Sequence, residues 1–187
     1  MGWSIDSLMC GDKFLGYVFN CLDGPFDGSY CSQLQQQTVA AQINVPGKPY
    51  VSAKSADQIL AMADDNGFVS SGADTGSGQC VALVKAAIPA LGATANWCAG
   101  DALDSAGIAK LLPGTAIGYG FDSKTGAYPS AATGNHVAIF VSATGSMATI
   151  LDQWQHKSKG TKQKAKTHET DIDATDWVIV TRKAVTS

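Results

Sequence analysis

The spacing of the apolar residues changes part-way along this 187-residue chain. Val81, Val84 and Ile88 recur at the three- and four-residue intervals of an amphipathic helix. After residue 114 apolar and polar residues alternate, which is typical of strands with one buried face. The segments expected to form strands are 115–119, 136–142, 147–154 and 177–182. Helices followed by a run of antiparallel strands predict an α+β fold.

Two helices are expected before these strands. The first lies within residues 51–67, where Ser55 is a candidate N-cap and Gly67 ends the apolar pattern. The second begins near Cys80 and ends near Ile88, because Pro89 cannot continue a helix.

Composition and charge limit the class of protein. With 45% hydrophobic residues the chain can bury a core, and we expect one folded domain at 51–187 preceded by an extension of unknown role at 1–50. A net charge of −3 argues against a general nucleic-acid binder. No apolar run approaches the roughly 18 residues that cross a bilayer. The first residues lack the basic start of a signal peptide, so export would need a specialised route.

Cys80 follows the glycine-rich segment 76–79 and opens the second expected helix. A helix N-terminus stabilises a thiolate, and its free N–H groups can bind an oxyanion. A cysteine on an amphipathic helix is more commonly a core residue. The glycine-rich approach and a candidate partner histidine favour a nucleophile here.

That partner, His136, begins the second expected strand. If residues 143–145 form the connecting loop, Asp152 on the next strand lies directly opposite His136, with both side chains on one face. A two-residue loop would place Gln153 there instead. Either side chain could orient an imidazole that accepts the proton of Cys80. The sequence therefore predicts a catalytic triad of cysteine, histidine and aspartate, with glutamine as the alternative third member.

Residues beside the expected triad are candidate substrate contacts. They are Gln79, Asn135, Gln153 and Trp154. The tryptophan could equally pack in the core.

Other chemistries lack their motifs. There is no CxxC and no paired His/Cys spacing, so we expect no zinc site and no cofactor. Glu169 is the single glutamate, which weakens a glycosidase or HExxH interpretation. The remaining cysteines could be disulfides or free thiols: Cys10, Cys21, Cys31 and Cys98.

Residues 157–166 contain five lysines and no acidic residue. We expect a solvated loop or hairpin arm; contact with an anionic polymer or an acidic partner is the sharper alternative. His156 and His168 flank this segment and are weaker catalytic candidates.

Four segments together resemble a known group of enzymes, the NlpC-type and CHAP-type papain-like amidases. The resemblance is closer to the small amidase effectors delivered by type VI secretion, and covers roughly residues 51–187. The segments are GQCVALV (78–84), PGTAI (113–117), GNHVAI (134–139) and LDQW (151–154).

The resemblance implies a papain-like core, in which a helix bearing cysteine packs on an antiparallel sheet bearing histidine. It also implies hydrolysis of amide bonds in peptidoglycan stem peptides. Cys80 would be the nucleophile, His136 the general base and Asp152 the orienting residue. A cognate immunity protein, a secretion apparatus and action in the target-cell periplasm are implied as well.

Two alternatives stay open at this point. Papain-like scaffolds also carry proteases, deamidases, acyltransferases and thioesterases, so a host protein could be the substrate. The chain could also be a binding module with a degenerate site. The residues leave the scissile bond undetermined.

Overall fold

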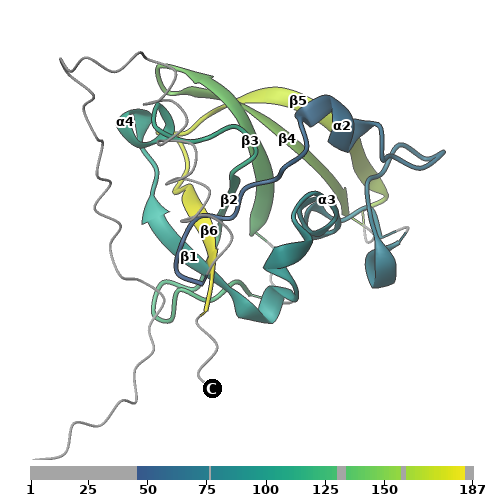
Figure 1. Cartoon of the computed structure of the whole chain (residues 1–187), viewed down its shortest axis with the longest axis horizontal. Coiled ribbons are helices and arrows are strands. Elements are labelled where there is room, and N and C mark those ends of the chain that lie inside the picture. The colour runs from purple at the N-terminus through teal and green to yellow at the C-terminus, as the bar shows by residue number, and fades with distance from the viewer. Residues whose placement is uncertain (1–45, 76, 130–133, 157–158, 184–187) are drawn as a thin grey trace, which may run out of the picture.

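The computed structural model describes residues 46–75, 77–129, 134–156 and 159–183. A six-stranded antiparallel sheet with the order β1-β6-β2-β3-β4-β5 forms its framework (Figure 1). The strands are β1 (Trp97–Ala102), β2 (Ala116–Tyr119), β3 (His136–Thr144), β4 (Met147–His156), β5 (Thr161–Asp171) and β6 (Val178–Arg182). The α-helices of the described ranges are α2 (Ala56–Leu60), α3 (Cys80–Ala87) and α4 (Ser105–Ile108). The expected α+β class is confirmed.

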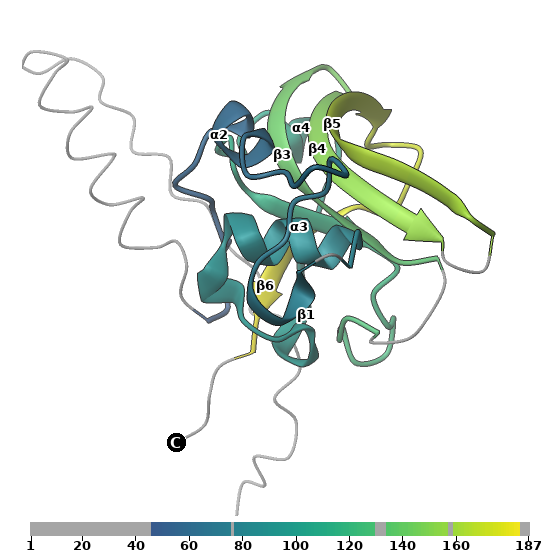
Figure 2. The ribbon, with the colours of Figure 1, turned by 90° about the vertical axis from the view of Figure 1, so that its right-hand side faces the viewer.

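The sheet separates two groups of buried side chains, because neighbouring residues of a strand point to opposite faces. Val137 of β3 belongs to the same cluster as Leu83 of α3. Ala138, the next residue, belongs to a second cluster that includes Ile108 of α4. The helices α3 and α4 therefore cover different faces of the sheet (Figure 2).

Both predicted helices are present, and the N-cap of the first and both ends of the second lie where they were expected. Ser55 caps α2 and shares a capping box with Gln58, whose backbone N–H donates to the serine hydroxyl at 3.2 Å. The helix is shorter than the expected segment and ends at Leu60. α3 begins at Cys80 and ends at Ala87, two residues before Pro89.

Strand β1 was not expected, and β5 lies where a solvated loop or hairpin arm was expected. β5 occupies most of the lysine-rich segment and forms the outer arm of a hairpin with β4. Its Lys162 and Lys164 are exposed, whereas Gln163 and Ala165 are half-buried. The exposed positions are lysines and the half-buried ones are a glutamine and an alanine. The segment therefore lacks the alternation of apolar and polar residues by which a strand is recognised in a sequence.

The predicted loop between β3 and β4, at residues 143–145, is wrong in both position and length. The strands pair as far as Thr144 and Met147, which leaves only Gly145 and Ser146 in the turn. Gly145 has a φ of 61°, a left-handed conformation that tight hairpin turns require and that glycine adopts without strain.

The predicted pairing of His136 is also wrong. The β3–β4 register shifts between Phe140 and Ser142, and beyond this bulge Ile139 pairs with Leu151. Continuing that register by one residue places Asp152 opposite Ala138, so neither Asp152 nor Gln153 lies directly opposite His136. Asp152 is instead a diagonal neighbour of His136 on the same face of the sheet.

Tyr50 is 1% exposed, and its carbonyl accepts a hydrogen bond from the Ala116 N–H, so the packed core already includes residue 50. Residues 1–45 of the expected extension, which include Cys10, Cys21 and Cys31, lie outside the described residues. Cys98 is disulfide-bonded. No helix within the described ranges is long and apolar enough to cross a membrane.

Candidate active site

Cys80 is the first residue of α3 and is 9% exposed. The chain approaches it through Gly78, which has a φ of 63°. A Cβ atom at position 78 would lie 2.7 Å from Oε1 of Gln155 and 3.2 Å from the ring of Phe68. The glycine therefore lets the segment before the thiol pass between β4 and the Phe68 ring.

Gln153 on β4 holds the residue that precedes α3 by a side-chain hydrogen bond. Its side chain is fully buried, accepts a hydrogen bond from the Val69 N–H at 2.7 Å, and donates to the carbonyls of Val69 and Gln79. Gln79 in turn donates from Nε2 to the Gln155 carbonyl at 3.0 Å. These bonds tie the residue before Cys80 to strand β4.

The structure brings Cys80, His136 and Asp152 together. Nε2 of His136 lies 2.6 Å from Oδ2 of Asp152. The His136 ring also lies beside the Cys80 side chain, where it stabilises the thiolate. Because Nε2 is engaged by the carboxylate, Nδ1 is the ring nitrogen left to exchange a proton with the thiol.

Asp152 is buried, with 3% of its surface exposed, and both carboxylate oxygens have contacts. Oδ2 bonds His136, whereas Oδ1 accepts from Nε2 of Gln163 on β5 at 2.5 Å. Nδ1 of His168 lies 3.4 Å from Oδ1 but makes no hydrogen bond. Of the two weaker histidine candidates, His168 therefore lies beside the carboxylate. His156 instead packs against Trp154 in a tilted arrangement, with ring centroids 5.3 Å apart.

The surroundings favour an ion pair between the thiol and the imidazole. Burial alone would raise the pKa of Cys80, but the hydrogen bond and charge of His136, with smaller contributions from the Val137 backbone and Tyr128, make the net shift downward. Burial would lower the pKa of His136, but hydrogen bonds to Asp152 and Cys80 raise it to about 9. A lowered thiol pKa beside a raised imidazole pKa means that the thiolate and the imidazolium stabilise each other.

Tyr128 completes the site and was not predicted from the sequence. Its hydroxyl lies beside Cys80 and stabilises the thiolate, and its ring packs against Trp97 and Phe121 with centroids 5.5 and 5.2 Å away. Burial and the Cys80 charge raise the pKa of Tyr128 far above its ordinary value, so it stays a donor. The tyrosine lies in a connection without periodicity, and only its neighbours Gly126 and Pro129 indicated a turn there.

The predicted substrate contacts divide into two groups. Gln153 is a buried structural residue with all its amide groups occupied, so it does not fit the predicted substrate contact. Gln79, Asn135 and Trp154 are half-buried. Asn135 donates to the Pro129 carbonyl at 3.0 Å. A substrate role for these three stays a prediction.

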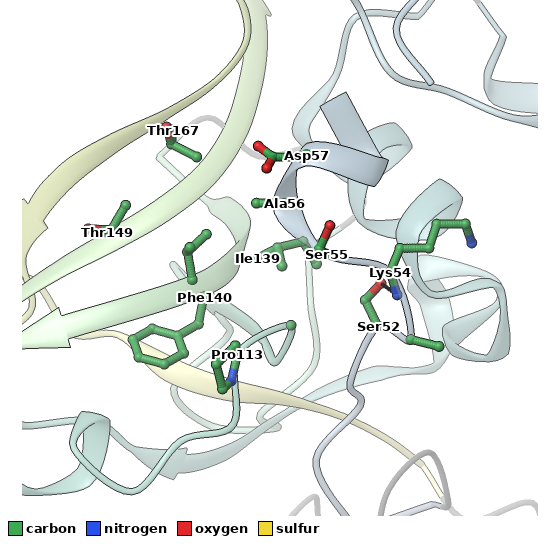
Figure 3. Close-up of a pocket in the computed structure, with 13 residues that line it drawn as sticks. Ser52, Lys54, Ser55, Ala56, Asp57, Pro113, Ile139, Phe140, Thr149 and Thr167 are labelled. Atoms are coloured by element: carbon green, nitrogen blue, oxygen red, sulfur yellow. Dashed lines mark hydrogen bonds between the residues drawn. The ribbon is translucent and has the colours of Figure 1, made fainter. Parts of the chain in front are cut away.

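A separate groove of about 600 Å³ lies beside α2 and β3. Its lining includes Ser52, Ser55, Thr149 and Thr167, and Figure 3 shows Asp57 pointing toward the two threonines. Cys80, His136 and Asp152 are not among the lining residues, so this groove is distinct from the cysteine site. Across the described residues no group of three or more His, Cys, Asp or Glu side chains could hold a metal ion.

Comparison with known families decides which group the chain belongs to. The family described as domesticated amidase effector 2 matches residues 50–173, which include Cys80, His136 and Asp152. This chain belongs to that family.

For this member of the domesticated amidase effector 2 family, the match to a solved structure is weak. A solved structure titled "Type 6 secretion amidase effector 2 (Tae2)" is 23% identical, with a TM-score of 0.48. The match covers 72% of this chain and 96% of that one. No curated protein shows significant similarity to the chain.

Proposed function

We propose that this protein is a cysteine-dependent amidase that hydrolyses amide bonds in peptidoglycan stem peptides. The observation that carries the proposal is the cluster of Cys80, His136 and Asp152, in which the imidazole bonds the carboxylate and lies beside the thiol at the start of α3. From this arrangement we infer a papain-like core. Membership of an amidase effector family supports the reaction class.

In the proposed reaction the Cys80 thiolate attacks the carbonyl carbon of the scissile amide. Backbone N–H groups in the first turn of α3 stabilise the oxyanion of the tetrahedral intermediate. His136 gives its proton to the leaving amine, and a thioester to Cys80 remains. The neutral imidazole then takes a proton from water, hydroxide attacks the thioester, and the thiolate is released.

Asp152 acts on His136 rather than on the substrate. Its carboxylate binds the Nε2 side of the ring, which keeps Nδ1 directed at Cys80 and stabilises the imidazolium. The Gln163 amide, on the other carboxylate oxygen, limits rotation of that carboxylate.

We further propose that the protein is an antibacterial effector, exported by a specialised secretion system and active in the target-cell periplasm. A cognate immunity protein would then protect the producing cell by covering the site around Cys80. Lysis of cells only when the protein is directed to the periplasm is the expected result.

Digestion of purified peptidoglycan tests the enzymatic proposal. Fragments released by the wild type are compared by mass spectrometry with those released by Cys80→Ala, and their masses identify the cleaved bond. Release by the wild type alone supports the proposal. Equal release by both proteins would overturn the role of Cys80 as nucleophile. Cleavage of host proteins but not of peptidoglycan would show that the substrate is a protein.

A further inference from the structure

The exposed face of β5 next to the cysteine site carries two lysines without a carboxylate partner. Lys162 and Lys164 are exposed, and within the described ranges neither forms an ion pair. The chain as a whole has a net charge of −3, so this pair of positive side chains is opposite in sign to the overall charge. The lysines are available to an external anion.

A short series of contacts links Lys162 to the nucleophile. Lys162 pairs with Gln155 across the β4–β5 ladder. The carbonyl of Gln155 accepts the hydrogen bond from Gln79, the residue before Cys80. The Lys162 ammonium lies 5.8 Å from the ring centroid of Phe68, and that ring packs beside Gly78. The ammonium is thus held at the rim of the site, where the start of α3 also favours negative charge.

Lys164 lies on the same side of β5. Its aliphatic carbons pass beside Gly67, whose added Cβ would be 2.7 Å from Cδ of the lysine. The neighbouring Ala165 N–H donates to the Gly67 carbonyl at 3.0 Å, which fastens this part of β5 to the loop before Phe68. A bulge between Asp152 and Trp154 separates this pair from Lys166, which lies opposite Asp152.

We propose that Lys162, assisted by Lys164, binds a carboxylate of an acidic peptide substrate next to the scissile amide. This rests on the proposed amidase function and adds a substrate class to it: stem peptides with free carboxylates are bound, and those with carboxamides are discriminated against. An ammonium and a carboxylate form a charge-assisted contact that a neutral amide cannot replace. Lysines that served only to keep an edge strand from pairing with other chains would show no dependence on substrate charge.

The test uses one stem peptide in two forms, with its carboxylates free or converted to carboxamides. The wild type should show a kcat/KM about three- to tenfold higher for the free form. Lys162→Gln should remove this preference by raising KM, with kcat nearly unchanged, and Lys164→Gln should reduce it. Lys110→Gln, a change of the same charge at an exposed position after α4, should keep the preference.

Binding of both peptides to the Cys80→Ala variant separates this proposal from the enzymatic one. Tighter binding of the free carboxylate form, lost in the double variant with Lys162→Gln, supports the lysine site even if neither peptide is cleaved. Equal cleavage and equal binding of the two forms would overturn the lysine site and leave the amidase proposal intact. A preference that survives Lys162→Gln would also overturn it.

Discussion

The 2.6 Å contact between Nε2 of His136 and Oδ2 of Asp152 joins residues that are not paired directly across the β3–β4 ladder. A bulge between Phe140 and Ser142 makes the contact possible. Without it, the turn register would place the two side chains on opposite faces of the sheet, because a shift of one residue reverses the face. The bulge is therefore part of the site.

Replacing Asp152 by asparagine should keep the shape of this contact and remove its charge. Since the Asp152 hydrogen bond raises the pKa of His136, the variant's imidazole should lose its proton at lower pH. We expect kcat to fall by about 10²–10⁴-fold and the alkaline limb of the pH–rate profile to move to lower pH. Asp176→Asn, at an exposed position, is the matched control. An unchanged profile for Asp152→Asn would contradict the orienting role.

The pH dependence of the wild type follows from the two shifts. Thiolate is present above the lowered pKa of Cys80, and the imidazolium that protonates the leaving amine is present below about 9. Initial rates of hydrolysis should therefore rise through the first value and fall through the second. A decline centred near about 6.5, the ordinary histidine value, would show that Asp152 does not support His136 as described.

Tyr128→Phe removes one donor from the Cys80 thiolate and leaves the ring contacts with Trp97 and Phe121 in place. The thiol pKa should rise, because that hydrogen bond lowers it. We expect kcat/KM to fall by about 10- to 100-fold and the acid limb of the profile to move upward. Tyr119→Phe, which leaves this hydrogen bond intact, should not move that limb. A Tyr128→Phe variant with wild-type kinetics would exclude a role for the hydroxyl.

Gln153→Met keeps the side-chain volume and removes three hydrogen bonds to the backbone of Val69 and Gln79. Buried groups without partners are costly, so the free energy of unfolding should fall by about 2–4 kcal/mol. Chemical denaturation measures this directly. Unchanged stability would mean that water or a rearranged loop replaces the amide.

Much of the chain was predictable where local rules decide the outcome. The cap at Ser55 and the end of α3 before Pro89 follow from hydrogen bonding and ring geometry within a few residues. The His136–Asp152 contact was expected, but from the wrong pairing. The expected register and the observed one differ by two residues, which preserves the face that each side chain occupies.

Other features depend on contacts that no local pattern encodes. The bulge after Phe140 compensates for a turn one residue shorter than expected. The half-buried positions of β5 carry polar or small residues. Its packing against β4 and the Gly67 loop could therefore not be predicted from apolar periodicity. Tyr128 reaches Cys80 because the rings of Trp97 on β1 and of Phe121 in the β2–β3 connection support its own ring. Gln153 looked like an active-site amide until its burial was known.

The rate at which iodoacetamide alkylates Cys80, followed against pH and located by peptide mass mapping, tests the central claim most directly. If His136 holds the thiol as a thiolate, alkylation of the wild type should already be fast at pH values well below the ordinary thiol pKa, and His136→Gln should need a higher pH for the same rate. A wild-type rate that rises only near about pH 8.5, as for an ordinary thiol, and is unaffected by His136→Gln would contradict it.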